Sequence, residues 1–187
     1  AKESEAAAKV LGLAERINLD MGDGRLADTL ENRRKLISEI RRLRPTIVMS
    51  HHWHDLHPDH CVAATLMKAC MYPSGMPRYD ADGEAFRPNE VLFFMGHFPF
   101  EPNLIVDVTE DMETKLAACR CYQSQLHRPG STERETSISQ PDFLDHIVAR
   151  ARHYGSQIQK TYGEPFGVLR PVPVVDLEEL YRPFPKR

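Results

Sequence analysis

The chain has 187 residues, of which 41% are hydrophobic and 27% are charged, and its formal net charge is -3. These values are ordinary for a globular protein, and we expect a single domain over residues 1–187. Because the sequence shows no basic patch and no apolar run near the ~20 residues of a membrane span, we expect neither nucleic acid nor a membrane as a partner. The four cysteines show no CxxC spacing, which favours reduced thiols and the cytoplasm.

Predicted helices and strands alternate through the first part of the chain. We expect helices over 2–14, 28–43 and 59–71, and strands over 17–21 and 46–49. The second helix carries an apolar stripe, and either Asp28 or Thr29 is a suitable N-cap for it. Its four arginines are interpreted as a solvated face rather than a binding site: Arg33, Arg34, Arg41 and Arg42.

The alternation continues to about residue 161. A polar loop over 72–88 is expected to form a rim over a site, and a polar linker covers 127–139. Strands are expected over 90–95, 103–108 and 172–175, and helices over 109–125 and 141–161. This pattern predicts a mostly parallel, layered α/β sheet.

The segment 50–60 concentrates five of the nine histidines and two aspartates between a predicted strand and a predicted helix. Open α/β sheets bind their ligands in loops at the carboxyl ends of strands. Imidazoles and carboxylates in such a loop suit metal ligation and proton transfer. The sequence therefore predicts a metal-dependent enzyme.

Three residues in this segment carry the expected chemistry. Pro58 suits the first position of a helix, so Asp59 and His60 fall in its first turn. His60 is then placed to bind a metal, and His57 to act as a general acid or oxyanion donor. Asp59 is expected to hydrogen-bond an imidazole and fix its tautomer. The alternative is that Asp59 only caps the helix while the histidines are exposed loop residues. The remaining histidines are each interpreted as wall or solvent residues: His51, His52 and His54.

The Asp55-Leu56-His57-Pro58-Asp59-His60 sequence resembles the second motif of the zinc-dependent N-acetylglucosaminyl deacetylases of the PIG-L/LmbE type. Further segments resemble the branch that deacetylates the bacillithiol precursor: 23–26, 31–33, 44–45, 105–109, Lys115, 122–125 and 162–166. The resemblance implies a Rossmann-like α/β fold, a zinc ion and a homo-oligomer, often a hexamer. It also implies a small acetamido-sugar substrate, an N-acetylglucosamine conjugate such as the malate glycoside.

The resemblance assigns roles to the same residues. It implies that His60 binds zinc, that His57 is the general acid that supports the oxyanion, and that Asp59 tunes His57. Leu56 departs from the arginine of close relatives. The family's first motif, His-Pro-Asp-Asp, which supplies two zinc ligands and the aspartate base, has no match in the chain. Because the chain also opens in mid-helix, we expect a strand, a helix and a strand, ~50 residues, to be absent at its N-terminus.

The sequence thus predicts a zinc-dependent hydrolase that removes the N-acetyl group from an amino sugar. Arg87, in the polar loop, is a candidate for gripping a substrate carboxylate, with a plain surface arginine as the alternative. Two other functions stay open. One is a metal-dependent phosphoesterase, which usually needs a second metal and more carboxylates. The other is a non-catalytic remnant or oligomeric binding module that lacks a complete zinc site.

Overall fold

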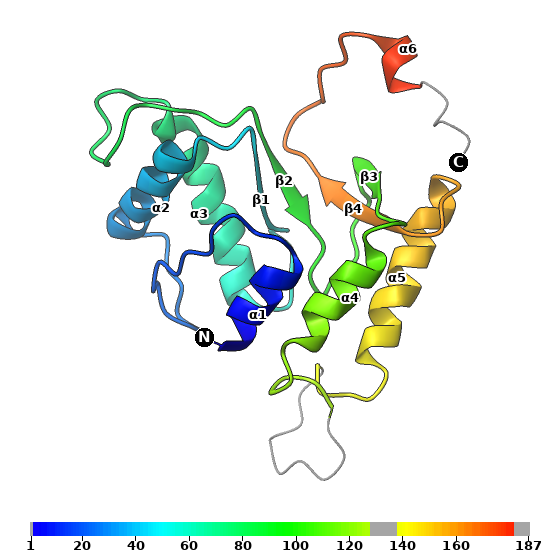
Figure 1. Ribbon diagram of the computed structural model, residues 1–187. Coiled ribbons are helices and arrows are strands. Elements are labelled where there is room, and N and C mark those ends of the chain that lie inside the picture. Colours follow the sequence, from blue (N-terminus) through cyan, green and yellow to red (C-terminus); the bar gives the residue numbers. More distant parts are fainter. Residues whose placement is uncertain (1, 128–137, 182–187) are drawn as a thin grey trace.

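A computed structural model describes residues 2–127 and 138–181 of the chain (Figure 1). The described elements include six helices: α1 (Lys2–Val10), α2 (Leu30–Leu43), α3 (Pro58–Ser74), α4 (Met112–Arg120), α5 (Phe143–Gln157) and α6 (Leu177–Leu180). They also include four strands: β1 (Ile47–His51), β2 (Glu90–Phe94), β3 (Leu104–Asp107) and β4 (Gly163–Gly167). Most of the linker at 127–139 lies outside the described residues.

The strands form one sheet in the order β1-β2-β4-β3. β1 and β2 are parallel, whereas β4 is antiparallel to both of its neighbours, β2 and β3. Three strands therefore run in one direction and only β4 runs in the other. The expected Rossmann-like α/β class is confirmed, with one reversed strand that the sequence pattern did not predict.

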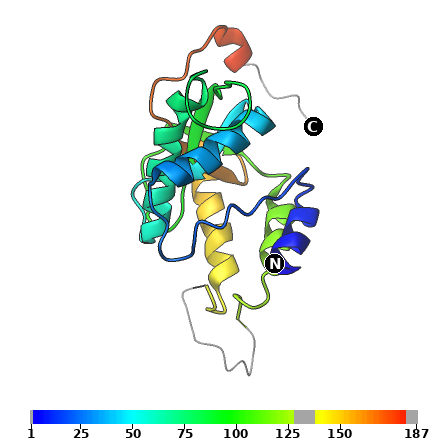
Figure 2. The same cartoon turned by 90° about the vertical axis from the view of Figure 1, so that its left-hand side faces the viewer.

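The main core lies between β1, β2 and the helix pair α2 and α3, which lie side by side (Figure 2). Ile37 of α2, Cys70 of α3 and Phe93 of β2 are each fully buried there. Thr29 caps α2, since its side-chain oxygen accepts the backbone N–H of Asn32 at 3.1 Å. This packing holds β1 and α3 in place, and these two elements flank the histidine-rich segment.

β1 lies at an edge of the described sheet and pairs only with β2. Side chains alternate between the faces of a strand, so Ile47 and Met49 lie on the face opposite Val48. Ile47 is 48% exposed and Met49 is 57% exposed. The outward face of β1 is therefore apolar and uncovered among the described residues.

Several expected elements differ from the structure. Residues 17–21 form no strand, α4 ends at Arg120 rather than near 125, and residues 172–175 form no strand. The fourth strand is instead β4, which contains two glycines and a proline and so lacks the usual composition of a strand. It forms because its backbone pairs with β2 and β3, a long-range contact that the local pattern does not contain.

Arg41 does not belong to a solvated face, because only 4% of it is exposed. Its guanidinium donates hydrogen bonds to the carbonyls of Ser74, Met76, Ala81 and Gly83. These bonds anchor the loop after α3, at the end of α3 that is opposite the histidines. The expectation that this loop forms a rim over the site is therefore wrong.

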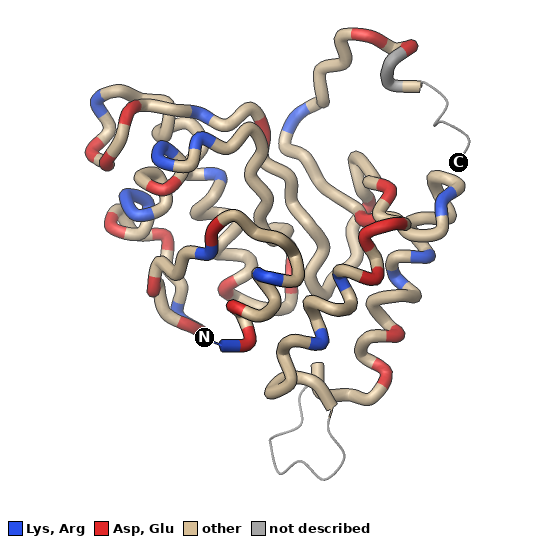
Figure 3. The backbone as a smooth tube through the Cα atoms, viewed as in Figure 1, with Lys and Arg blue, Asp and Glu red and all other residues tan. Residues whose placement is uncertain are grey.

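Charged residues of both signs are interspersed along the described chain, as on α2 (Figure 3). No helix within 2–127 or 138–181 is long and apolar enough to cross a membrane.

Candidate metal centre

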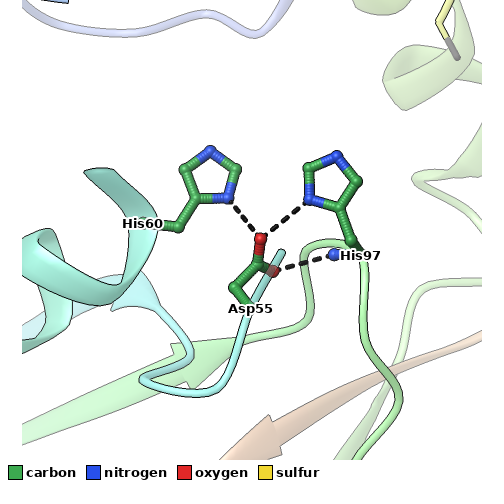
Figure 4. A group of neighbouring side chains, drawn as sticks. All are labelled: Asp55, His60 and His97. Atoms are coloured by element: carbon green, nitrogen blue, oxygen red, sulfur yellow. Dashed lines mark hydrogen bonds and ion pairs between the residues drawn. The ribbon is translucent and has the colours of Figure 1, made fainter. Parts of the chain in front are cut away.

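The histidine-rich segment lies at the carboxyl end of β1. β1 ends at His51 and α3 begins at Pro58, so residues 52–57 form the connection. β2 is parallel to β1, and the turn that follows it reaches the same end of the sheet. This turn brings His97 next to Asp55 of the connection (Figure 4). The cluster thus occupies the edge where open α/β sheets bind ligands.

Asp55 is the centre of the cluster, and 0% of its side chain is exposed. Its Oδ1 accepts the backbone N–H of His57 at 3.0 Å and lies 2.9 Å from Nδ1 of His60 and 2.8 Å from Nδ1 of His97. Its Oδ2 accepts the backbone N–H of His97 at 2.8 Å. Three of these four contacts fall on Oδ1 and one falls on Oδ2, which keeps an open lone pair.

The hydrogen bonds to Asp55 determine which ring nitrogens carry protons. Burial alone raises the pKa of Asp55, but hydrogen bonds from the backbone of His57 and from the backbone and ring of His97, together with the His60 ring, lower it below its ordinary value. The ionised carboxylate can only accept, so Nδ1 of His60 and Nδ1 of His97 are both donors. Nε2 of each neutral ring is then an unprotonated acceptor, the form in which imidazole binds a metal.

His57 has the opposite arrangement. Its Nδ1 accepts the backbone N–H of Asp59 at 3.2 Å and caps α3. An accepting Nδ1 carries no proton, so the proton of the neutral ring is on Nε2. The ring centroids of His57 and His60 are 4.8 Å apart. The cluster therefore presents one imidazole donor next to an imidazole acceptor.

The other histidines of the segment form the surroundings of the cluster. The ring of His51 stacks on His60 with centroids 3.7 Å apart. Burial lowers the pKa of His51 to about 4, and the neighbouring His60 ring acts in the same direction, so His51 is neutral near pH 7. His52 is buried between Trp53 and Phe100, and burial lowers its pKa as well. His54 lies on the exposed side of the connection, against Phe98.

Asp59 is placed differently from the sequence expectation. Its Oδ2 accepts the backbone N–H of Gly24 at 2.7 Å, and its Oδ1 accepts that of Leu26 at 3.1 Å. Within the described residues its carboxylate makes no hydrogen bond to a histidine ring. It therefore anchors the loop before α2 to the first turn of α3, and it touches His57 only through its own backbone N–H.

Arg87 is not brought to the cluster. Its Nη2 donates to the carbonyl of Tyr72 at 3.1 Å, and its guanidinium lies 4.3 Å over the Tyr72 ring. Tyr72 is in the last turns of α3, ~18 Å of helix rise beyond His60. The structure therefore gives no support to a substrate contact by Arg87.

Asp55, His60 and His97 form a group that could hold a metal ion, since one possible ligand atom of each lies within 4.8 Å of the others. Imidazole nitrogen suits zinc and several other divalent metals. Four hydrogen bonds already hold the Asp55 carboxylate, three of them on Oδ1, whereas Nε2 of His60 and of His97 has no hydrogen bond within the described ranges. The donor set fits a metal, with the imidazoles as ligands and Asp55 behind them.

Gly96 is required by this geometry. A Cβ built on Gly96 would collide with Oδ2 of Asp55 and lie 3.3 Å from Nδ1 of His60. We expect Gly96→Ala to displace the Asp55 carboxylate, lowering stability by ~1–3 kcal/mol, as for a buried acceptor that loses its partners, and metal affinity ~10–100-fold. Urea unfolding and metal titration would measure both effects.

Gly167→Ala is a matched control for that substitution. A Cβ at Gly167 would make ordinary contacts, the nearest at 3.5 Å from the His52 ring. We expect Gly167→Ala to leave both the stability and the metal affinity nearly unchanged. Unchanged metal affinity in Gly96→Ala would show that the position of Asp55 does not matter for the site.

Known proteins resemble this chain in both sequence and fold. The family model for PIG-L, the GlcNAc-PI de-N-acetylase family, matches residues 1–71. Diacetylchitobiose deacetylase from Thermococcus kodakarensis is 32% identical over 130 residues, which are 67% of this chain and 49% of that protein. The chain belongs to the PIG-L family. It spans about half the length of this curated relative.

Two solved structures of similar proteins extend the likeness over nearly the whole chain. A conserved protein from Thermus thermophilus is 34% identical, with a TM-score of 0.83 over 93% of this chain and 74% of that one. N,N'-diacetylchitobiose deacetylase from Pyrococcus horikoshii, solved with its inhibitor, is 25% identical, with a TM-score of 0.74 over 94% of this chain and 67% of that one. The PIG-L chain described here therefore shares its fold with a deacetylase.

Sequence reasoning did not identify Asp55 and His97 as site residues. Asp55 lies within the quoted motif, where no role was assigned to it. His97 is 42 residues from Asp55 in the chain. The signal that could have identified it is its position. His97 lies just after β2, and β2 pairs with β1, which leads into the histidine-rich segment.

Proposed function

We propose that this protein is a zinc-dependent hydrolase that removes the N-acetyl group from an N-acetylglucosamine conjugate. The observation that carries the proposal is the pairing of two imidazoles in opposite tautomers. His60 presents an unprotonated Nε2, held from behind by Asp55 at 2.9 Å, and His57 beside it presents an Nε2–H. Membership of the PIG-L family and the deacetylase relatives support amide hydrolysis as the reaction.

His60 would hold the zinc ion through Nε2. When bound, zinc supplies Lewis acidity, which polarises an amide carbonyl and makes water more acidic. Asp55 keeps the His60 ring in the required tautomer, because its carboxylate accepts a hydrogen bond from Nδ1–H. Hydrolysis of an amide at such a centre also needs a proton donor for the departing amine.

His57 would be that donor. Its Nε2–H can hydrogen-bond the acetyl oxygen as negative charge develops there. The same proton can then pass to the amine nitrogen when the C–N bond breaks, and the proton released by the attacking water returns the ring to its neutral form. Its Nδ1 is held by the N–H of Asp59, so the ring is oriented by the first turn of α3.

We further propose that the remaining zinc ligands and the aspartate base come from protein outside these 187 residues. A hydrolytic zinc site uses three protein ligands and an open position. The described cluster offers only two uncommitted imidazole nitrogens. The family resemblance also supports a bacillithiol-type malate glycoside as substrate, a homo-oligomer such as a hexamer, and a cytoplasmic location.

The proposed reaction is tested by giving two substrates to the zinc-loaded protein, expressed from its natural gene. We expect acetate release from N-acetylglucosamine and its glycosides, and no phosphate release from a generic phosphate monoester. Zinc removal by a chelator should abolish acetate release, and zinc should restore it. Phosphate release without acetate release would assign a phosphoesterase instead. Stoichiometric zinc without either activity would favour a binding module.

A further inference from the structure

The peptide group between Gly96 and His97 connects the metal group to helix α5. Its N–H donates a hydrogen bond to Oδ2 of Asp55 at 2.8 Å (Figure 4). Its C=O accepts a hydrogen bond from Nη1 of Arg150 at 2.6 Å. The described residues contain no cis peptide bond, so the N–H and the C=O of this group point in opposite directions. Arg150 and Asp55 therefore hold the same peptide group from opposite sides.

The position of this peptide group decides where the Asp55 carboxylate can lie. Two of the four hydrogen bonds to Asp55 come from His97, one from its backbone N–H and one from its ring, each at 2.8 Å. A Cβ on Gly96 would collide with Oδ2 of Asp55, so the turn and the carboxylate are in close contact. A displaced turn would therefore displace Asp55, which stands behind the rings of His60 and His97.

Helix α5 provides a fixed support for the turn. It shares a buried apolar cluster with α4, formed by Met112, Leu116 and Ala151. Tyr154 follows Arg150 by four residues and so lies on the same face of the helix. Tyr154 is 5% exposed, and its hydroxyl lies 3.8 Å from Sδ of Met95, next to Gly96. Two neighbouring side chains of α5 thus contact the turn that carries His97.

The contacts form a chain of hydrogen bonds from a cation to a carboxylate. The guanidinium of Arg150 donates to the amide oxygen, and the N–H of the same amide donates to Asp55. Hydrogen bonds to charged groups are stronger than neutral ones, and successive bonds in a chain polarise one another. Removing the guanidinium should therefore weaken the bond from His97 to Asp55, although Arg150 bonds to neither side chain among the described residues.

We propose that Arg150 is a positioning residue of the metal centre, acting on metal binding through the Gly96–His97 peptide group and Asp55. The inference rests on the proposed function in one respect, because it takes Asp55, His60 and His97 as the group that serves the metal. It gives α5, which supplies none of these three side chains, an effect on the affinity of the site.

The variant Arg150→Met removes the guanidinium and keeps an unbranched side chain that suits a helix. In the protein expressed from its natural gene, we expect zinc affinity to fall ~10-fold, the low end of the range for groups that orient metal ligands. In the metal-free protein, the amide proton of His97 should move upfield and exchange faster with solvent, because its hydrogen bond to Asp55 is weaker. Titration calorimetry and proton–nitrogen NMR measure the two effects.

Two further variants serve as controls. Arg152→Met makes the same change on an exposed residue of α5, whose guanidinium lies 5.9 Å from the centroid of the Tyr162 ring. It should leave zinc affinity and the His97 amide unchanged. Arg150→Lys should retain most of both, because a single donor bonds Gly96 and an ammonium can supply one. Parent-like zinc affinity in Arg150→Met, or an equal loss in Arg152→Met, would overturn the proposal.

A double-mutant cycle distinguishes positioning from a general loss of stability. Because the effect is proposed to pass through Asp55, Arg150→Met should cause no further loss of zinc affinity in an Asp55→Ala background. The same ~10-fold loss in both backgrounds would show that Arg150 only supports the fold, and would contradict the proposal. If Arg150→Met does not fold in urea titrations, Arg150→Gln and Arg152→Gln repeat the comparison, with a smaller loss expected for Arg150→Gln because its amide can still donate.

The result is separable from the proposed reaction. The shift and exchange of the His97 amide are measured without zinc and without substrate, so they test Arg150 even in a protein that shows no turnover. If the amide and zinc results hold but no acetate is released, the role of Arg150 stands and the proposed deacetylation fails. An unchanged His97 amide in Arg150→Met would remove Arg150 from the metal centre, whatever the activity.

Discussion

Replacing His57 with alanine is expected to lower the rate of deacetylation ~10²–10⁴-fold while zinc stays bound, the usual effect of losing a general acid. The reason is that His57 places a proton on Nε2, and its Nδ1 is already committed to the N–H of Asp59 at 3.2 Å. The helix cap thus imposes the tautomer in which the ring donates a hydrogen bond from Nε2. Steady-state kinetics and metal analysis of the same preparation would measure the two properties.

A second variant separates catalysis from the helix cap. Because His57 caps α3, His57→Ala is also expected to cost ~1 kcal/mol of stability. His57→Asn retains a good N-cap acceptor but has no group at the position of Nε2. It should therefore be as inactive as His57→Ala and nearly as stable as the parent protein. If His57→Ala lost its zinc instead, the roles of His57 and His60 would have to be exchanged.

Replacing His60 with alanine is expected to abolish stoichiometric zinc binding, in any form of the protein that binds zinc. His60 presents an unprotonated Nε2 because its Nδ1–H donates a hydrogen bond to Asp55 at 2.9 Å. Metal analysis after dialysis, with circular dichroism to check the fold, would test this. The loss should exceed the ~10–100-fold drop expected for Gly96→Ala, which disturbs only the supporting carboxylate.

A histidine elsewhere in the chain provides the control for His60. His146 lies on α5, where its side chain is 71% exposed and pairs with Asp142 one turn earlier. His146→Ala should leave zinc binding and acetate release unchanged. Full zinc occupancy in His60→Ala would remove His60 from the set of ligands.

The local elements that position the site were predicted well because their signals are short-range. Thr29 caps α2 as expected, and Pro58 begins α3 with His57 at the cap. β1 and β2 lie within a few residues of their expected bounds. Caps and apolar periodicity act over one or two turns, so the sequence alone contains them.

The composition and order of residues by themselves determined the α/β class, the location of the histidine-rich segment at the end of a strand, and the family resemblance. Only the tertiary structure decided how the site is assembled. The parallel pairing of β1 and β2 brings His97 to Asp55 across 42 residues, and the close approach of Gly96 leaves room for the carboxylate. Asp59 turned to the backbone of Gly24 and Leu26, Arg41 became buried, and Arg87 packed on Tyr72. These outcomes depend on which distant backbone groups need a hydrogen-bond partner once the chain is packed, and no local pattern specifies that.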